Sequence, residues 1–308
     1  MTRARAPGKL VLSGAYSVLW GAPAIVTAVD RFAFADTSRA AVHVADEVVR
    51  AVEMGLVPSP CFVDASSLRA PTEDGGSRKL GLGSSAAILL ATLVAHRGAP
   101  TDAADRARLF EDALAAHRKA QGGGSGVDVA ASTFGGTLRF ERGDAASPSE
   151  HAAPRVAPLT LPSDARFTVF AAAEPATTSA MVAKVKALAA ADPAGFEKLI
   201  EHAKSGAVRA ANATSTRDLA DALAMQAEAL AEIGDRADAQ IVPTELRALA
   251  AEARQSGAYF GPSGAGGGDV AFHVGVTPPS DDFVREAARI GLAPLELTVG
   301  AGGAEELP

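Results

Sequence analysis

Hydrophobic residues recur at helical spacing through most of the second half of the chain. Between residues 179 and 256, alanine and leucine return every three or four positions, with charged residues between them. This period places the apolar side chains on one face of a helix, and Gly257 follows the last segment as a typical helix stop. The pattern predicts four helices, at 179–190, 194–212, 217–234 and 244–256.

Shorter segments with alternating or β-branched apolar residues predict strands. Residues 3–13 alternate loosely, and a turn at 20–23 separates them from a second strand. Residues 32–49 are predicted to hold one or two more strands, and the tail 300–308 is expected to be frayed. The other predicted strands are 24–29, 135–141, 167–171, 270–274 and 295–299.

Three further helices complete the expected elements. Apolar runs predict helices over 84–96 and 281–290. A third helix is expected to begin after Thr101 as its cap, with acidic residues in its first turn and basic residues in its last. That is the charge order that the helix dipole favours.

Strands and helices mix along the chain without strict βαβ alternation, which favours an α+β fold over a doubly wound sheet. A stretch rich in alanine, proline and serine, residues 143–165, interrupts the pattern. We place the domain boundary there, which gives an N-terminal domain at 1–150 and a C-terminal domain at 151–308.

Charge and length narrow the possible functions. The chain has 308 residues and a formal net charge of −7, with a pI near 5.4. This balance argues against binding to nucleic acid or to an anionic membrane surface. An anionic substrate must therefore be held by a local group of lysine and arginine side chains.

The single cysteine and the N-terminal segment indicate a soluble cytoplasmic protein. Cys61 has no partner for a disulfide within the chain, which fits a reducing compartment, and it is expected to be buried. The uncharged stretch 10–29 resembles a membrane span, but glycine, serine and proline interrupt it. The histidines show no metal-ligand spacing, so no structural metal is predicted.

A glycine-rich stretch at 79–87, Lys-Leu-Gly-Leu-Gly-Ser-Ser-Ala-Ala, enters the predicted helix at Ser84. Glycines let a backbone approach a bulky anion, and the first N–H groups of a helix point toward it. Ser84 and Ser85 add hydroxyls suited to a phosphate oxygen or a magnesium ion. The alternative is an ordinary serine-capped helix after a loop.

Two more glycine-rich segments, 121–128 and 261–269, lie far from the first. Neither a P-loop nor a dinucleotide-binding Gly-x-Gly-x-x-Gly loop is present. Taken in order, three motifs resemble those of the GHMP kinase superfamily: Ala-Pro-Gly-Lys-Leu-Val-Leu-Ser-Gly at 6–14, Gly-Leu-Gly-Ser-Ser-Ala-Ala at 81–87 and Ser-Gly-Ala-Gly-Gly-Gly-Asp at 263–269.

The resemblance implies a two-domain fold, with an S5-like α+β domain, a ferredoxin-like α+β domain and an active site in the cleft between them. It also implies ATP and Mg²⁺ as cofactors, Lys9 and Asp128 as catalytic residues, and Ser85 as the magnesium contact. Lys79 is either a nucleotide contact or a solvated lysine. The resemblance implies nucleotide contacts at Lys79, Gly81, Gly83, Ser84, Ser85 and Ala86.

Within the superfamily, segments 116–132 and 175–179 resemble the phosphomevalonate kinase branch. This implies transfer of a phosphoryl group from ATP to 5-phosphomevalonate, giving 5-diphosphomevalonate and ADP in a monomer or homodimer. His117 and Arg118 are also explained by packing or by helix-end charge. The implied substrate contacts are His117, Arg118, Ser125, Gly126, Thr177, Thr178, Ser179, Gly264, Ala265, Gly266 and Asp269.

Whether the reaction needs a general base depends on the acceptor. A phosphate monoester is already mostly anionic at pH 7, so Asp128 is expected to matter mainly for placing Lys9. A hydroxyl acceptor such as mevalonate, which would need a base, is the alternative substrate.

The chain departs from the superfamily at Ala15, where relatives usually carry glutamate. That departure is the support in the sequence for a further alternative, a ligand-binding paralogue without activity. A diphosphomevalonate decarboxylase is disfavoured by the intact Gly-Leu-Gly-Ser-Ser-Ala-Ala loop.

Overall fold

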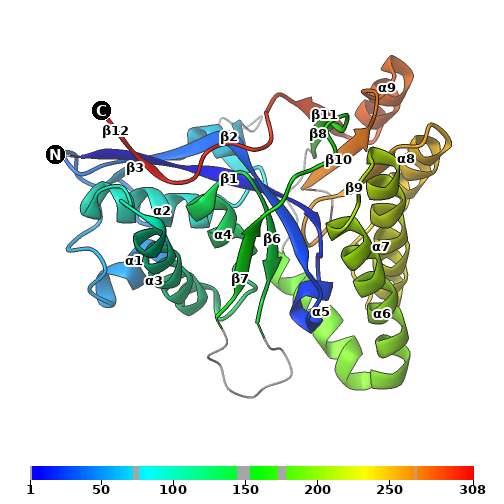
Figure 1. Ribbon diagram of the computed structural model, residues 1–308, viewed down its shortest axis with the longest axis horizontal. Coiled ribbons are helices and arrows are strands. Elements are labelled where there is room, and N and C mark those ends of the chain that lie inside the picture. The colour runs from blue at the N-terminus through cyan, green and yellow to red at the C-terminus, as the bar shows by residue number, and fades with distance from the viewer. Residues whose placement is uncertain (1, 72–75, 144–152, 173–177, 268) are drawn as a thin grey trace. The chain divides into compact units, whose positions relative to one another are not determined.

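The computed structural model describes residues 2–71, 76–143, 153–172, 178–267 and 269–308. They form two units that are not consecutive in the chain (Figure 1). Unit 1 contains Met1–Leu10, Val26–Leu138 and Leu297–Pro308, and unit 2 contains Val11–Ile25 and Arg139–Glu296. The sequence predicts a single boundary near residue 150, whereas the chain passes between the units several times.

Unit 1 is built on a sheet in which β12, β1, β2 and β6 are successive neighbours and β3 pairs with β2. Helices α2, α3 and α4 pack against one another beside β1 and β2 (Figure 1), and α1 packs on α2 and α3. A small hairpin, β4 and β5, precedes the glycine-rich loop. Three strands have residues in both units: β1 (Arg3–Ser13), β2 (Ala24–Asp36) and β6 (Thr137–Glu141). The other strands of unit 1 are β3 (Phe62–Asp64), β4 (Arg69–Pro71), β5 (Ser77–Lys79) and β12 (Glu305–Leu307), and its helices are η2 (Ser66–Leu68), α1 (Asp46–Glu53), α2 (Ser84–Arg97), α3 (Ala103–Gln121) and α4 (Val127–Phe134).

Unit 2 contains a four-stranded antiparallel sheet in the order β11-β8-β10-β9. Numbered along the chain, this order is 4-1-3-2, the arrangement of ferredoxin-like folds. The rings of Phe170, Phe260 and Phe283 meet edge to face in its core, with centroids 5.1–6.2 Å apart. The elements are η1 (Ser17–Trp20), β7 (Arg155–Pro158), β8 (Arg166–Ala172), α5 (Thr178–Ala191), α6 (Pro193–Ala211), α7 (Thr216–Arg236), α8 (Thr244–Gln255), β9 (Tyr259–Pro262), β10 (Val270–Gly275), α9 (Asp281–Arg289) and β11 (Leu292–Leu295).

The α+β class and most helices expected from the periodicity are confirmed. The four helices predicted between 179 and 256 appear as α5 to α8, each within two residues of the expected ends. Their long apolar stripes leave little freedom in placing them. Cys61 is buried, as expected, and burial raises the pKa of its thiol.

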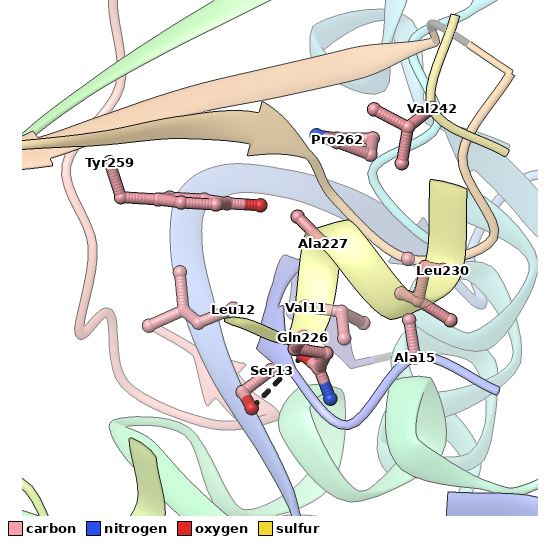
Figure 2. Close-up of a pocket in the computed structure, with 11 residues that line it drawn as sticks. Val11, Leu12, Ser13, Ala15, Gln226, Ala227, Leu230, Val242, Tyr259 and Pro262 are labelled. Carbon is pink, nitrogen blue, oxygen red and sulfur yellow. Dashed lines mark hydrogen bonds between the residues drawn. The ribbon is translucent and has the colours of Figure 1, made fainter. Parts of the chain in front are cut away.

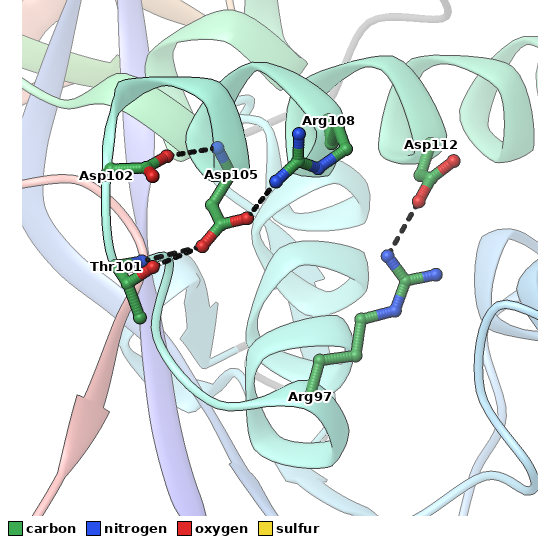
Figure 3. A network of polar contacts seen from close by, with 6 residues as sticks. All are labelled: Arg97, Thr101, Asp102, Asp105, Arg108 and Asp112. Carbon is green, nitrogen blue, oxygen red and sulfur yellow. Dashed lines mark hydrogen bonds and ion pairs between the residues drawn. The ribbon is translucent and has the colours of Figure 1, made fainter.

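Figure 3 shows why α3 begins one residue later than expected. The side chain of Asp102 accepts a hydrogen bond from the backbone N–H of Asp105 at 2.7 Å, so Asp102 is the cap. Thr101 instead bonds to the carboxylate of Asp105. Arg97, at the end of α2, pairs with Asp112 of α3 at 2.7 Å. The prediction of Thr101 as the cap was wrong because either side chain suits that position.

Other expectations were wrong for identifiable reasons. The sequence predicts strands over residues 32–49, but α1 begins at Asp46, where an acidic first turn favours a helix despite three valines. The last strand of the ferredoxin-like sheet is β11, not 295–299. The tail is not frayed, because β12 pairs antiparallel with β1. Among the described residues, no helix is long and apolar enough to cross a bilayer.

Candidate active site

Lys9 lies against the glycine-rich loop of unit 1. Its backbone N–H donates to the carbonyl of Leu82 at 2.8 Å, and its ammonium donates to the carbonyl of Gly81 at 3.0 Å. Lys9 belongs to strand β1, which continues through Pro7 and Gly8 without a turn. The strand and the loop therefore hold a cation at the place where the sequence predicts phosphates.

Gly83 makes this contact possible. It caps α2 in a left-handed conformation, with φ of 74°, which few side chains adopt without strain. A Cβ atom at this position would lie 2.9 Å from Cγ of Lys9. Glycine therefore satisfies both the backbone turn and the close passage of the lysine stem.

The N-terminus of α2 has no side-chain cap. Its first backbone N–H groups are therefore oriented to bind an anion, as in other phosphate-binding helices. Ser84 is buried, Ser85 is half-buried and the side chain of Ala86 is fully buried, so Ala86 has only its N–H to offer. These features fit a phosphate group.

Asp128 closes the glycine-rich segment 121–128 and lies in the first turn of α4, which the sequence analysis does not predict as a helix. Its Oδ2 lies 3.2 Å from Nε2 of His117, and its Oδ1 accepts a hydrogen bond from the N–H of Val129 at 3.0 Å. Burial raises the pKa of Asp128, but the charge and hydrogen bond of His117, with Lys9 and Val129, outweigh it and lower the pKa to about 2. Asp128 is therefore ionised throughout the physiological range.

The donors present suit a metal that arrives with a nucleotide. Among the residues that the structure describes, no group of three histidine, cysteine or acidic side chains could hold a metal ion. Magnesium commonly takes one or two protein oxygens together with substrate phosphates and water. The hydroxyl of the half-buried Ser85, at the start of α2, could supply one such protein oxygen.

In unit 2, the third glycine-rich segment follows β9. The hydroxyl of Tyr16 donates to the carbonyl of Ala265 at 2.7 Å, and the N–H of Val11 donates to the Ser263 hydroxyl at 3.0 Å. At Gly266, where φ is 83°, a Cβ atom would lie 2.0 Å from the carbonyl oxygen of Ile241. The segment is thus fixed by β1 on one side and by the Ile241 backbone on the other.

Gln226 of α7 fixes the chain near Ala15. Its Oε1 accepts hydrogen bonds from the N–H of Gly14 at 3.1 Å and from the Ser13 hydroxyl at 3.3 Å. Figure 2 shows these side chains around a cavity of about 10 Å³, which Ala15 and Tyr259 also line. The sequence did not lead us to Gln226. The signal was a glutamine within the apolar stripe of α7, where a buried polar side chain needs hydrogen-bond partners.

The remaining predicted residues lie in scattered positions. Lys79 is exposed at the end of β5, and Arg118 is half-buried in the last turn of α3. The hydroxyl of Ser125 accepts a hydrogen bond from the N–H of Val127 at 3.4 Å. Thr177 lies outside the described residues. The others are Gly126, the cap of α4; Thr178 and Ser179, which begin α5; and Gly264 and Asp269, which flank the third glycine-rich turn.

Comparison with known proteins identifies related sequences and folds. Residues 60–136 match the GHMP kinases N terminal domain family. The chain is similar to phosphomevalonate kinase from Streptomyces sp. strain CL190, at 29% identity over 97% of each chain. It is also similar to mevalonate kinase from Archaeoglobus fulgidus, at 26% identity over 94% of this chain and 98% of the relative.

A solved structure has the same fold. Phosphomevalonate kinase from Streptococcus pneumoniae, in complex with phosphomevalonate and AMPPNP, matches with a TM-score of 0.76 at 17% identity, covering 97% of this chain and 100% of that one. The fold and these matches define a kinase-type phosphotransferase. As the motifs predict, residues 60–136 match the N-terminal domain of GHMP kinases, and over nearly its whole length the chain is similar to a phosphomevalonate kinase and to a mevalonate kinase.

Proposed function

We propose that this protein transfers the terminal phosphoryl group of ATP to (R)-5-phosphomevalonate, giving 5-diphosphomevalonate and ADP, a step of isoprenoid precursor synthesis. Similarity to a phosphomevalonate kinase over nearly the whole chain supports the assignment. Similarity to a mevalonate kinase keeps the hydroxyl acceptor as the second candidate.

The state of Asp128 is the observation that favours a phosphate acceptor. A general base works best with a pKa near the operating pH, whereas the pKa of Asp128 is about 2. Such a carboxylate is a weak base but a stable anion. A phosphomevalonate phosphate is already ionised at neutral pH and needs no base, so it suits the site better than an alcohol.

The residues of unit 1 then have separate tasks. The start of α2 and the Gly81–Gly83 backbone bind the ATP phosphates, with Ser85 contacting Mg²⁺, which neutralises phosphate charge when bound. Lys9 supplies positive charge for the transferred phosphoryl group, and Asp128 holds the charge of Lys9 in place. Phosphoryl transfer depends mainly on such positioning and neutralisation.

In unit 2, the third glycine-rich segment and the start of α5 are the candidates for holding the acceptor. Backbone N–H groups at a helix start suit an anionic group. Lys184 of α5 pairs with Asp238 at 3.0 Å, so its ammonium is already engaged by a carboxylate. We therefore leave Lys184 out of the proposed acceptor contacts.

A coupled assay of ADP release tests the proposal. With Mg²⁺-ATP present, turnover is expected with phosphomevalonate and at least tenfold less with mevalonate at equal concentration. Faster turnover with mevalonate would overturn the choice of acceptor. ATP binding without turnover across both acids would instead support a ligand-binding paralogue, for which Ala15 is the motivating departure.

A further inference from the structure

Two polar pairs lie near the start of α4: Gln121 with Glu47, and His117 with Asp128. The side-chain N–H of Gln121 donates to the carboxylate of Glu47, and Nε2 of His117 meets Oδ2 of Asp128 at 3.2 Å. Glu47 is 3% exposed and His117 is 6% exposed. They come from three helices, α1, α3 and α4, so the fold brings together residues that are distant in the sequence.

We propose that His117 is a positioning residue, which fixes the Asp128 carboxylate in one orientation as a permanent anion beside Lys9 and does not itself contact the acceptor. This inference rests on the proposed function, and it changes the role that the sequence suggests for His117. The side chain is too deeply buried to reach a substrate, yet it touches a residue of the site.

The geometry leaves Asp128 little freedom to rotate. One carboxylate oxygen accepts from the Val129 N–H and the other meets His117. Each hydrogen bond to the charged form stabilises that form. Because both oxygens are engaged, the plane of the carboxylate is set by α4 and α3 together.

The charges around His117 favour its protonated form. Burial lowers the pKa of His117, but Asp128 outweighs it through charge and a hydrogen bond, with a further contribution from Glu47, and the net shift is upward. The charge of Arg118 opposes this upward shift of the pKa of His117, and the charge of Lys9 helps to lower the pKa of Asp128. Within the described residues, Nδ1 of His117 is buried without a hydrogen-bond partner, so its contact with Asp128 runs through Nε2 alone.

Nuclear magnetic resonance tests the pair without any turnover. The imidazole signals of His117 are assigned as those missing from His117→Leu, and are then titrated in the intact protein and in Asp128→Asn. The pKa of His117 is expected to lie above 6.5 and to fall by at least one unit in Asp128→Asn. An unchanged titration would overturn the pairing, whichever acceptor the enzyme uses.

Kinetics test the consequence for the reaction. His117→Gln keeps a side-chain N–H but loses the charge, whereas His117→Leu loses both. We expect kcat at pH 7 to fall at least tenfold in His117→Leu, and by less in His117→Gln, with KM for ATP changed less than twofold.

A second buried histidine provides the control. His273 lies in β10 of unit 2, against the ring of Phe283. His273→Gln is expected to leave kcat within twofold, even if thermal stability falls. A loss of kcat in His273→Gln equal to that in His117→Leu, or no loss in either His117 variant, would overturn the positioning role. If phosphomevalonate is not a substrate, the titration still decides the pairing by itself.

Discussion

At Asp128, burial opposes the ionised form, while His117, Lys9 and the Val129 N–H stabilise it. The stabilising contacts outweigh the effect of burial, so the carboxylate stays ionised far below neutral pH. An anion of this kind suits the orientation of a neighbouring ammonium better than it suits proton abstraction. The relative importance of Lys9 and Asp128 follows from this.

Lys9→Ala is expected to cost more rate than Asp128→Asn. Under the proposed function, removing the lysine deletes the positive charge offered to the transferred phosphoryl group, for which a loss of about 10²–10³-fold in kcat is expected. Asparagine keeps a carbonyl oxygen for the Val129 N–H, so a loss of about tenfold is expected, the effect of weakening one charge-assisted hydrogen bond. Steady-state kinetics of both variants decide this, and a larger loss in Asp128→Asn would point to a general base.

The pairing of His117 with Asp128 makes the free energy of unfolding depend on pH in two directions. His117 binds its proton more tightly when folded, so its contribution is complete below pH 6.5 and is lost as pH rises through the raised pKa. Asp128 has a lowered pKa, so its contribution is complete above pH 3.8 and is lost as pH falls toward 2. The pair therefore stabilises most between these limits.

Urea unfolding of the natural protein and of Asp128→Asn measures this contribution. The difference in the free energy of unfolding is expected to be about 1–3 kcal/mol at pH 5, the range for a charged hydrogen bond, and smaller at pH 9. A difference that is equal at both pH values would contradict the pairing.

Among the site residues, the motifs single out both Lys9 and the glycine-rich loop, and the structure places Lys9 against Gly81 and Leu82; their roles stay predictions. Why Asp128 lies beside His117 was not predictable in the same way. The connection between α3 and α4 runs through glycines with φ of 68°, 125°, 126° and 89°. Such conformations are open to glycine in many combinations, so the path of the chain cannot be derived from the residue types.

At the scale of elements, the start of α2 depends on a left-handed cap and on the passage of Lys9. Gly83→Ala is expected to lose about 1 kcal/mol of stability from backbone strain and, in addition, at least tenfold in affinity for ATP. The second effect arises because the new methyl group displaces the Lys9 stem. Isothermal titration with AMPPNP and thermal unfolding measure the two quantities.

Gly122→Ala is the matched control. Gly122 caps the end of α3 with φ of 68°, close to the 74° of Gly83, but no atom lies within 4 Å of its added Cβ. The Gly122→Ala variant is expected to lose about as much stability as Gly83→Ala and to keep its affinity for ATP. Equal affinity losses in both variants would show that strain alone, and not the lysine contact, weakens binding.

Element prediction succeeded where one physical signal dominated. The helices of unit 2 have long apolar stripes, whereas α4 has only eight residues, follows a run of glycines and lacks a side-chain cap. Strand β12 has three residues in a segment rich in glycine and acidic residues. Short elements like these form because a partner is present, and the partner lies elsewhere in the sequence.

At the scale of the whole molecule, the last segment of unit 1, Leu297–Pro308, follows unit 2 in the sequence. In this segment, the N–H of Thr298 donates to Asp30 at 2.6 Å and the N–H of Ala304 donates to the carbonyl of Ser132 at 2.9 Å. β12 then pairs with β1. A boundary placed near residue 150 separates these partners.

A fragment of residues 1–150 is therefore expected to unfold without a cooperative transition. The same fragment with residues 297–308 attached through a flexible glycine–serine linker is expected to recover a cooperative transition. Thermal unfolding followed by circular dichroism compares the two. Cooperative unfolding of the shorter fragment at the temperature of the longer one would show that unit 1 is complete without this segment.

The same interleaving fixes an order of events during translation. The ribosome synthesises the glycine-rich loop 79–87 early, then the larger segment of unit 2, Arg139–Glu296, and only afterwards β12. A nascent chain therefore carries this loop for most of its synthesis while β1 lacks β12 as a paired strand. A chain released after Glu296 would hold the loop on a sheet without β12, so unit 1 is complete only once translation has passed residue 307.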